Sequence, residues 1–263
     1  MEMDKLGVVT TFIHNIVVYN IPLLYGTVGE IMVEKSGSLN LGVEGIMAVG
    51  AIFGYIVGCY ANSLGIGILT AFLMGALCGL LFAALTVSLQ ANQNITGLTL
   101  TTFGLGVYFF VGNGVKAVSW PVMNDYENIK NGFADLAIPG LSQIPVIGAL
   151  FQNMYPFEWI ILAIAVVSWY LMYKTRFGMH LRACGENPQS VDAAGGNVER
   201  TRFIAVMLSG ALSGVGGICF AYSISANFSP NIYMGYGYLA IAAMIFGNWN
   251  IPFTALVCLF FGL

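Results

Sequence analysis

Residues 64–89 read LGIGILTAFLMGALCGLLFAALTVSL, an uncharged run that is long enough to cross a bilayer as a helix. The uncharged region around it is much longer, since no Asp, Glu, Lys, Arg or His occurs from Gly45 to Val115, and none from Phe203 to Leu263. Charged residues make up 8% of the chain and the mean hydropathy is +0.81, whereas soluble domains carry roughly 25% charged residues. We therefore expect an all-α polytopic protein of the cell membrane, with one transmembrane domain over residues 1–263.

Apolar runs separated by polar positions divide the chain into about 7–8 transmembrane segments, some of them broken. The expected segments lie at residues 8–31, 41–60, 64–89, 95–112, 157–173, 203–225 and 237–263. The last run ends without a flanking charge or a tail, so we expect the C-terminus of the sequence to be truncated. Residues 114–156 carry five charged side chains and form the largest expected extracytoplasmic loop.

Two polar interruptions indicate segments that are not simple rods. Residues 34–44 and residues 247–252 place polar side chains, glycine and proline between apolar runs that no long loop separates. Transporters use such broken helices near the middle of the membrane, and an ordinary tight turn at the cytoplasmic surface is the alternative. A different pattern, glycine at 75 and 79 and again at 210 and 214, predicts helices whose backbones approach closely.

The segment from Lys174 to Arg202 holds five of the nine basic residues of the chain. Short loops rich in Lys and Arg stay on the cytoplasmic side of a membrane, so we expect residues 174–202 to be a cytoplasmic loop. Its middle also predicts a short helix, because Asn187 can cap it, Pro188 suits its first position and Gly195 can end it. A short helix held at the cytoplasmic surface between two spans is a candidate docking element.

No pattern for catalysis or for cofactor binding occurs. The chain has no GxxxxGK[ST] loop for ATP, and His14 and His180 stand alone. The five cysteines are scattered singly, without a CxxC pair that would predict a metal or redox site. A net charge of −3 provides no basic field for nucleic acid. We therefore expect no enzyme, no catalytic residue, no metal, no cofactor and no nucleic-acid partner.

Polar residues inside the apolar segments are the better functional candidates, because polar groups in hydrocarbon usually face a bundle interior or a pathway. Asn40 and Glu44 would share one helix face if the second segment begins near Asn40. Uncharged hydrogen-bonding side chains suit a polar, uncharged solute better than an ion. Structural clamping is the alternative for Asn and Glu, and bonding back to their own helix is the alternative for Thr. The candidate pathway residues are Ser36, Asn40, Glu44, Asn92, Asn94 and Thr96.

Three motifs resemble those of permease subunits of ATP-binding-cassette (ABC) importers. They are EKSGSLNLGVEGIM at residues 34–47, ANQNITG at 91–97 and RACGENPQSVDAAG at 182–195. They occur in the order of the branched-chain amino acid/simple sugar/nucleoside permease superfamily. The SGxxNLGxEG and GENPxxxDxAG patterns within them resemble the nucleoside-type branch, and the resemblance spans essentially the whole chain.

This resemblance implies a transport subunit that moves a small polar solute, a nucleoside above all, and that depends on a separate cytoplasmic ATPase. It also implies pairing with a second, related permease, the same or a different chain, and delivery of solute by an extracytoplasmic binding lipoprotein. The segment that couples such permeases to the ATPase corresponds to Gly185, Glu186, Asn187, Pro188, Asp192, Ala193, Ala194 and Gly195.

Other interpretations remain at this stage. The solute of a related permease could be a simple sugar or a branched-chain amino acid. An ion-coupled secondary transporter would need buried carboxylates, for which only Glu30 and Glu44 are available. A structural or assembly protein of the membrane would show no dependence on any solute.

Overall fold

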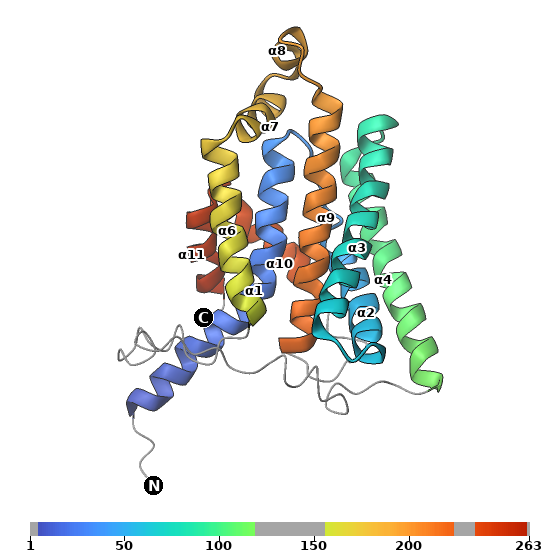
Figure 1. Cartoon of the computed structure of the whole chain (residues 1–263), viewed down its shortest axis with the longest axis vertical. Coiled ribbons are helices and arrows are strands. Elements are labelled where there is room, and N and C mark those ends of the chain that lie inside the picture. Colours follow the sequence, from blue (N-terminus) through green and yellow to red (C-terminus); the bar gives the residue numbers. More distant parts are fainter. Residues whose placement is uncertain (1–4, 119–155, 224–234, 262–263) are drawn as a thin grey trace.

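The computed structural model describes residues 5–118, 156–223 and 235–261, and all regular structure in these ranges is helical (Figure 1). The expected extracytoplasmic loop at 114–156 lies almost entirely outside the described residues. The helices are α1 (Lys5–Lys35), α2 (Val43–Tyr60), α3 (Leu64–Ala83) with its π-helical continuation η1 (Ala84–Ser88), α4 (Gln93–Val118), α6 (Pro156–Lys174), α7 (Arg176–Glu186), α8 (Pro188–Ala193), α9 (Val198–Ser223), α10 (Tyr236–Phe246) and α11 (Ile251–Phe261).

Five of the described helices are long and apolar enough to cross a membrane, namely α1, α2, α3 with η1, α4 and α9. A sixth crossing results if α6 and α7, which meet at a bend of 71°, are counted as one span. Helices α10 and α11 are apolar but shorter, and residues 247–250 separate them. The expectation of an all-α polytopic protein with broken segments is confirmed, whereas helix α7 was not predicted from the sequence.

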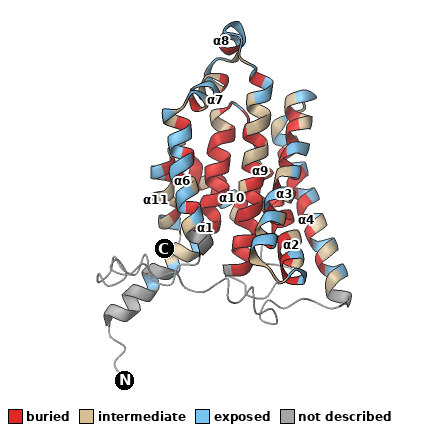
Figure 2. Cartoon of the chain, in the orientation of Figure 1, coloured by how far each residue is buried: buried red, intermediate tan, exposed pale blue. Residues whose placement is uncertain are grey.

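Burial divides the spans into an inner and an outer group. Between 72% and 78% of the apolar windows of α1, α2 and α9 is buried inside the protein, against 33% for those of α3 and α4 (Figure 2). Helix α9 contacts α1, α2 and α3 and runs through the middle of the bundle (Figure 1). Helices α3 and α4 expose many apolar side chains, Leu77 and Phe110 among them. Such a surface is expected to face lipid.

Helices α3 and α9 meet backbone to backbone. A Cβ atom added to Gly75 would overlap the backbone of Gly210, and one added to Gly210 would overlap the backbone of Gly75 and Gly79. A Cβ on Gly214 would likewise meet the backbone of Ala71 and Gly75. The predicted close approach through these small residues is confirmed, and we call this contact the glycine seam.

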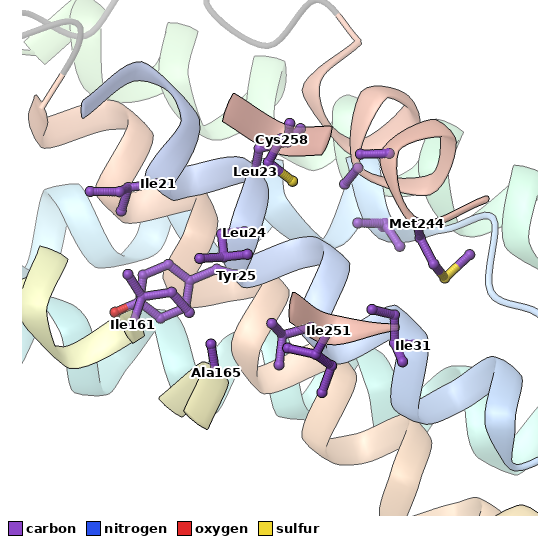
Figure 3. Packing of buried hydrophobic residues seen from close by; sticks show 14 of the residues in the cluster. Ile21, Leu23, Leu24, Tyr25, Ile31, Ile161, Ala165, Met244, Ile251 and Cys258 are labelled. Carbon is purple, nitrogen blue, oxygen red and sulfur yellow. The ribbon is translucent and has the colours of Figure 1, made fainter. Parts of the chain in front are cut away.

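The largest apolar cluster fastens the C-terminal helices to α1. Leu23 and Ile31 of α1 lie against α11, where Cys258 and Ile251 belong to the same cluster (Figure 3). Ile161 of α6 belongs to the same cluster and lies beside Tyr25 of α1 (Figure 3). The cluster therefore packs α6, α10 and α11 against α1.

Candidate functional site

The linker of residues 36–42 between α1 and α2 is irregular and largely buried. Helix α1 ends at Lys35, and the turn that follows it contains Gly37, whose φ is +83°, with the Ser38 N–H bonded to the Val33 carbonyl. The Asn40 N–H then donates to Glu30 Oε1 (2.9 Å), and the Gly42 N–H donates to Asn40 Oδ1 (2.8 Å). Because these bonds hold the linker outside the helix, α2 begins only at Val43. The prediction that Asn40 and Glu44 share a helix face was therefore wrong.

The linker also contacts the beginning of α4. The Leu39 N–H donates to Gln93 Oε1 (2.8 Å), and Thr101 Oγ1 donates to the Leu41 carbonyl (3.0 Å). Gly97 lies so close that a Cβ there would overlap the backbone of Leu41. The linker is therefore the interior part of a broken segment rather than an exposed turn, and it joins α1, α2 and α4.

Glu44 is 2% exposed and fixes the beginning of α10. Its carboxylate accepts hydrogen bonds from the N–H groups of Gly235 and Gly237. The first N–H groups of a helix lack intrahelical partners and carry partial positive charge, so a carboxylate is well suited to this position. Glu44 is therefore tied into the packing of α2 against α10.

The hairpin formed by α10 and α11 has a polar tip at residues 247–250. Two left-handed residues, Asn248 (φ +50°) and Trp249 (φ +53°), follow the end of α10 at Phe246. The indole N–H of Trp249 donates to the Glu34 carboxylate at the end of α1, and its carbonyl accepts from the Tyr173 hydroxyl (3.5 Å). The interruption predicted at 247–252 is thus a reversal of the chain that is pinned to α1 and α6.

The six candidate pathway residues fall into two groups. Ser36, Asn40 and Glu44 are buried, and Ser36 Oγ bonds back to the Val33 carbonyl (2.6 Å). Asn92 and Asn94 are exposed and Thr96 is half-buried. Asn92 Oδ1 accepts from the Asn94 N–H (3.1 Å) and so caps α4, and Thr96 Oγ1 bonds back to the Asn92 carbonyl (2.8 Å). The first group holds the linker and α10, and only the second lies at a surface.

The short helix predicted after Asn187 is present as α8, with the expected termini. Asn187 Oδ1 accepts from the Ser190 N–H (3.2 Å), Pro188 occupies the first turn, and Gly195 ends the helix with a φ of +79°. Buried Val191 anchors α8 on Cys184 and Val198. The exposed residues of the predicted coupling set are Glu186, Asn187, Asp192, Ala193, Ala194 and Gly195, whereas Gly185 and Pro188 are half-buried.

Helix α7 gives α8 a firm base. Thr175 follows α6, with its Oγ1 bonded to the Leu171 carbonyl (2.6 Å), and the same oxygen accepts from the Gly178 N–H (3.3 Å) to cap α7. Arg182 lies 5.3 Å from the centre of the Tyr173 ring. The two short helices therefore form one element, the α7–α8 element, which lies at one end of the bundle (Figure 1).

A polar cavity of about 780 Å³ lies between α8 on one side and Ser38 of the linker and the beginning of α4 on the other. Asp192 and Gly195 line it from one side, and Ser38 and Gln93 line it from the other. Arg202, a half-buried residue in the first turns of α9, also lines it. The sequence indicated Arg202 only as a positive charge, and its position at the beginning of an apolar helix was the available sign of a further role.

Comparison with known proteins places these features in a context. A family model described as "Branched-chain amino acid transport system / permease component" matches residues 12–263. The guanosine ABC transporter permease NupQ of Bacillus subtilis is 35% identical over 99% of this chain and 82% of its own length. The nucleoside ABC transporter permease NupC of Lactococcus lactis is 37% identical over 99% and 83%. The putative glucose ABC transporter permease TsgC13 of Haloferax volcanii is 32% identical over 87% and 68%.

Proposed function

We propose that this chain, which belongs to the family of branched-chain amino acid transport system permease components, moves a nucleoside. The chain is an integral membrane permease subunit of an ABC transporter, and ATP is hydrolysed by a partner ATPase and not by this chain. The observation that carries the choice of solute is the 35% and 37% identity to guanosine and nucleoside permeases over 99% of the chain. The relative named for glucose makes a sugar the second candidate.

Uptake competition tests the solute. The complete transporter, with its native ATPase, binding lipoprotein and any second permease, is produced in cells that lack nucleoside uptake, and entry of labelled guanosine is measured. We expect excess unlabelled adenosine or cytidine to suppress the uptake, and excess glucose, ribose or leucine to leave it unchanged. Suppression by a sugar, or saturable uptake of labelled sugar without uptake of guanosine, would move the assignment to the second candidate.

The solute path is the next part of the proposal. Asn92, Asn94 and Thr96 border the path at the beginning of α4, and Ser36, Asn40 and Glu44 hold the linker and α10 beside it. The exposure of the first group and the burial of the second support this division. Asn94→Leu is expected to lower uptake with the complex intact. Asn113→Leu, an exposed position near the other end of the same helix, is the matched control. Equal uptake by the two variants would place the path elsewhere.

The α7–α8 element is proposed to be the ATPase-docking site, formed by the coupling set from Gly185 to Gly195. Its support is a short helix that is capped at both ends, anchored by Val191 and exposed on its outer face. The five basic residues of 174–202 support a cytoplasmic position for this end of the bundle. The second permease and the binding lipoprotein then complete the transporter, the latter on the side of residues 114–156.

A charge reversal tests the docking site. Asp192 is an exposed residue of α8, where its carboxylate is available to a basic group of the ATPase. Asp192→Lys is expected to abolish co-purification of the ATPase, or to leave ATP hydrolysis insensitive to solute, without altering membrane insertion. Asp135→Lys makes the same change of charge in the expected extracytoplasmic loop and serves as the control. Identical behaviour of the two variants would remove the docking assignment.

A further inference from the structure

Arg202 ties together three elements that are distant in the sequence. From the first turns of α9, its Nε donates to the Ser36 carbonyl (3.0 Å) and its Nη2 donates to the Cys184 carbonyl (3.1 Å). Ser36 directly follows α1, and Cys184 belongs to the last turn of α7. One guanidinium group thus spans the joint between the linker and the α7–α8 element.

The two acceptors explain why the residue is an arginine. The last carbonyls of a helix have no intrahelical partners and carry partial negative charge, so both ends favour a cation. The two bonds leave from different nitrogens of one planar group, and the single ammonium of lysine does not reproduce that fork. Arg202 therefore holds the ends of α1 and α7 at a fixed relative position.

Glycines bring these two helix ends into direct contact beneath the guanidinium. A Cβ on Gly185 would overlap the Lys35 carbonyl oxygen, and a Cβ on Gly37 would lie 3.0 Å from the Gly185 Cα and 2.9 Å from Arg202 Nη2. At Gly185 and Gly37 the two backbones meet without a side chain between them. A displacement of the α7–α8 element would therefore push directly on the turn at residues 35–37.

The linker carries such a displacement onward to α4. The Leu39 N–H is bonded to Gln93 of α4, and the Asn40 N–H to Glu30 of α1. Ser38 Oγ and Asn40 Nδ2 are buried without a hydrogen-bond partner among the described residues. A buried polar atom left unpaired costs about 1–3 kcal/mol. The linker thus holds unused hydrogen-bonding groups that a shifted position could satisfy.

We propose that Arg202 is the positioning residue that makes the linker, and through Gln93 the beginning of α4, follow the movement of the α7–α8 element. This inference rests on the proposed function, since it assumes that the ATPase moves that element. The alternative is that Arg202 only stabilises the fold. In that case its loss would lower the amount of folded complex, whereas loss of a positioning residue would change the coupling between ATP hydrolysis and solute movement.

The experiment compares Arg202→Gln, Arg202→Lys and Arg200→Gln in the complete transporter reconstituted in liposomes. Arg200 is exposed two residues earlier on the same helix and is the matched control. For Arg202→Gln we expect normal co-purification of the ATPase, continued ATP hydrolysis that no longer responds to solute, and uptake reduced about tenfold, the effect of losing one charge-assisted hydrogen bond. Arg202→Lys should be intermediate, and Arg200→Gln should match the wild type.

A second variant breaks the same route at its other end. Gln93→Leu removes the acceptor of the Leu39 N–H but leaves Arg202 intact, so it should give the same uncoupled hydrolysis, and it decides the question if Arg202→Gln does not fold. Normal solute stimulation in both variants, or loss of ATPase docking in Arg202→Gln, overturns the inference. Failure of the proposed function has a different signature, because the wild-type complex itself would then show no solute-stimulated ATP hydrolysis.

Discussion

Helices α3 and α9 meet through glycine backbones, whereas two carboxylates join the apolar cluster around α1 in holding the α10–α11 hairpin to α1 and α2. In the glycine seam, four positions, Gly75 and Gly79 of α3 and Gly210 and Gly214 of α9, have no room for even a methyl group. At the hairpin, Glu44 holds the beginning of α10 and Glu34 holds the tip through Trp249. We call these two contacts the carboxylate latches.

The two kinds of contact respond differently to a displacement. Close backbone packing depends on many small dispersion contacts, all of which weaken together when helices separate. A hydrogen bond to a carboxylate is directional and can break singly, while its neighbours remain. We therefore expect the glycine seam to stay fixed during transport, and the latched hairpin and linker to contain the moving parts.

The largest effect should come from filling the glycine seam. Gly75→Ala places a Cβ against the backbone of Gly210, which cannot rotate away as a side chain can. Overpacking of this kind should cost about 3 kcal/mol of unfolding free energy, seen as a lower Tm and less monodisperse protein in detergent. Gly106→Ala is the control, because no heavy atom lies within 4 Å of a Cβ there. Equal Tm values for the two would show that the seam is not rigid.

Removal of the Glu44 latch should have the next largest effect. Glu44→Ala leaves the buried N–H of Gly237 and the half-buried N–H of Gly235 without their acceptor, at a cost of about 2 kcal/mol. Hydrogen exchange over residues 235–246 should quicken, while exchange in α3 and α9 stays slow. Glu44→Gln keeps one acceptor oxygen and should show about half the effect. Glu199→Ala, at an exposed glutamate of α9, should leave exchange over residues 235–246 unchanged. Equal exchange over these residues in all three variants would contradict the role of the Glu44 latch.

Much of this arrangement could be predicted from local patterns. The spans follow from apolar runs, the glycine seam from the spacing of 75 with 79 and of 210 with 214, and α8 from Asn187, Pro188 and Gly195. Each of these depends on residues near one another in the chain, so the sequence states it directly. The polar interruptions at 34–44 and 247–252 were predicted for the same reason.

The partners of the polar residues could not be predicted in this way. Glu44 bonds to residues 191 and 193 positions away, and Glu34 to one 215 positions away. Such pairs depend on how the broken segments fold back into the bundle, and one amino-acid sequence does not show this folding. The helical spacing of Asn40 and Glu44 was misleading because the bonds of Asn40 to Glu30 and Gly42 delay the start of α2. Arg202 was likewise recognised only as a charge.

The tip latch should give a smaller effect on stability than the Glu44 latch. Trp249→Phe keeps an aromatic ring but removes the N–H that donates to Glu34, at a cost of about 1 kcal/mol. Exchange at residues 247–250 should quicken and solute uptake should fall, with co-purification of the ATPase retained. Trp169→Phe, at an exposed position of α6, is the control. Unchanged exchange at the tip would limit the moving part to the linker.

The smallest effect concerns the backbone of the tip and separates strain from simple capping. Asn248 occupies the left-handed position that ends α10, with its N–H bonded to the Ile245 carbonyl and the next N–H to the Met244 carbonyl. Glycine is the preferred residue at this position and asparagine is tolerated. Asn248→Gly should therefore raise the unfolding free energy by less than about 0.5 kcal/mol.

The control is Asn250→Gly, two residues further on and without a positive φ. It should lower the unfolding free energy by about 0.5–1 kcal/mol, because glycine makes the unfolded chain more flexible. An increase of more than about 1 kcal/mol in the unfolding free energy of Asn248→Gly would mean that the backbone of the tip is strained in this structure, where Trp249 is bonded to Glu34. The Glu34–Trp249 bond would then restrain a hairpin that tends to open, and loss of that bond alone would release it.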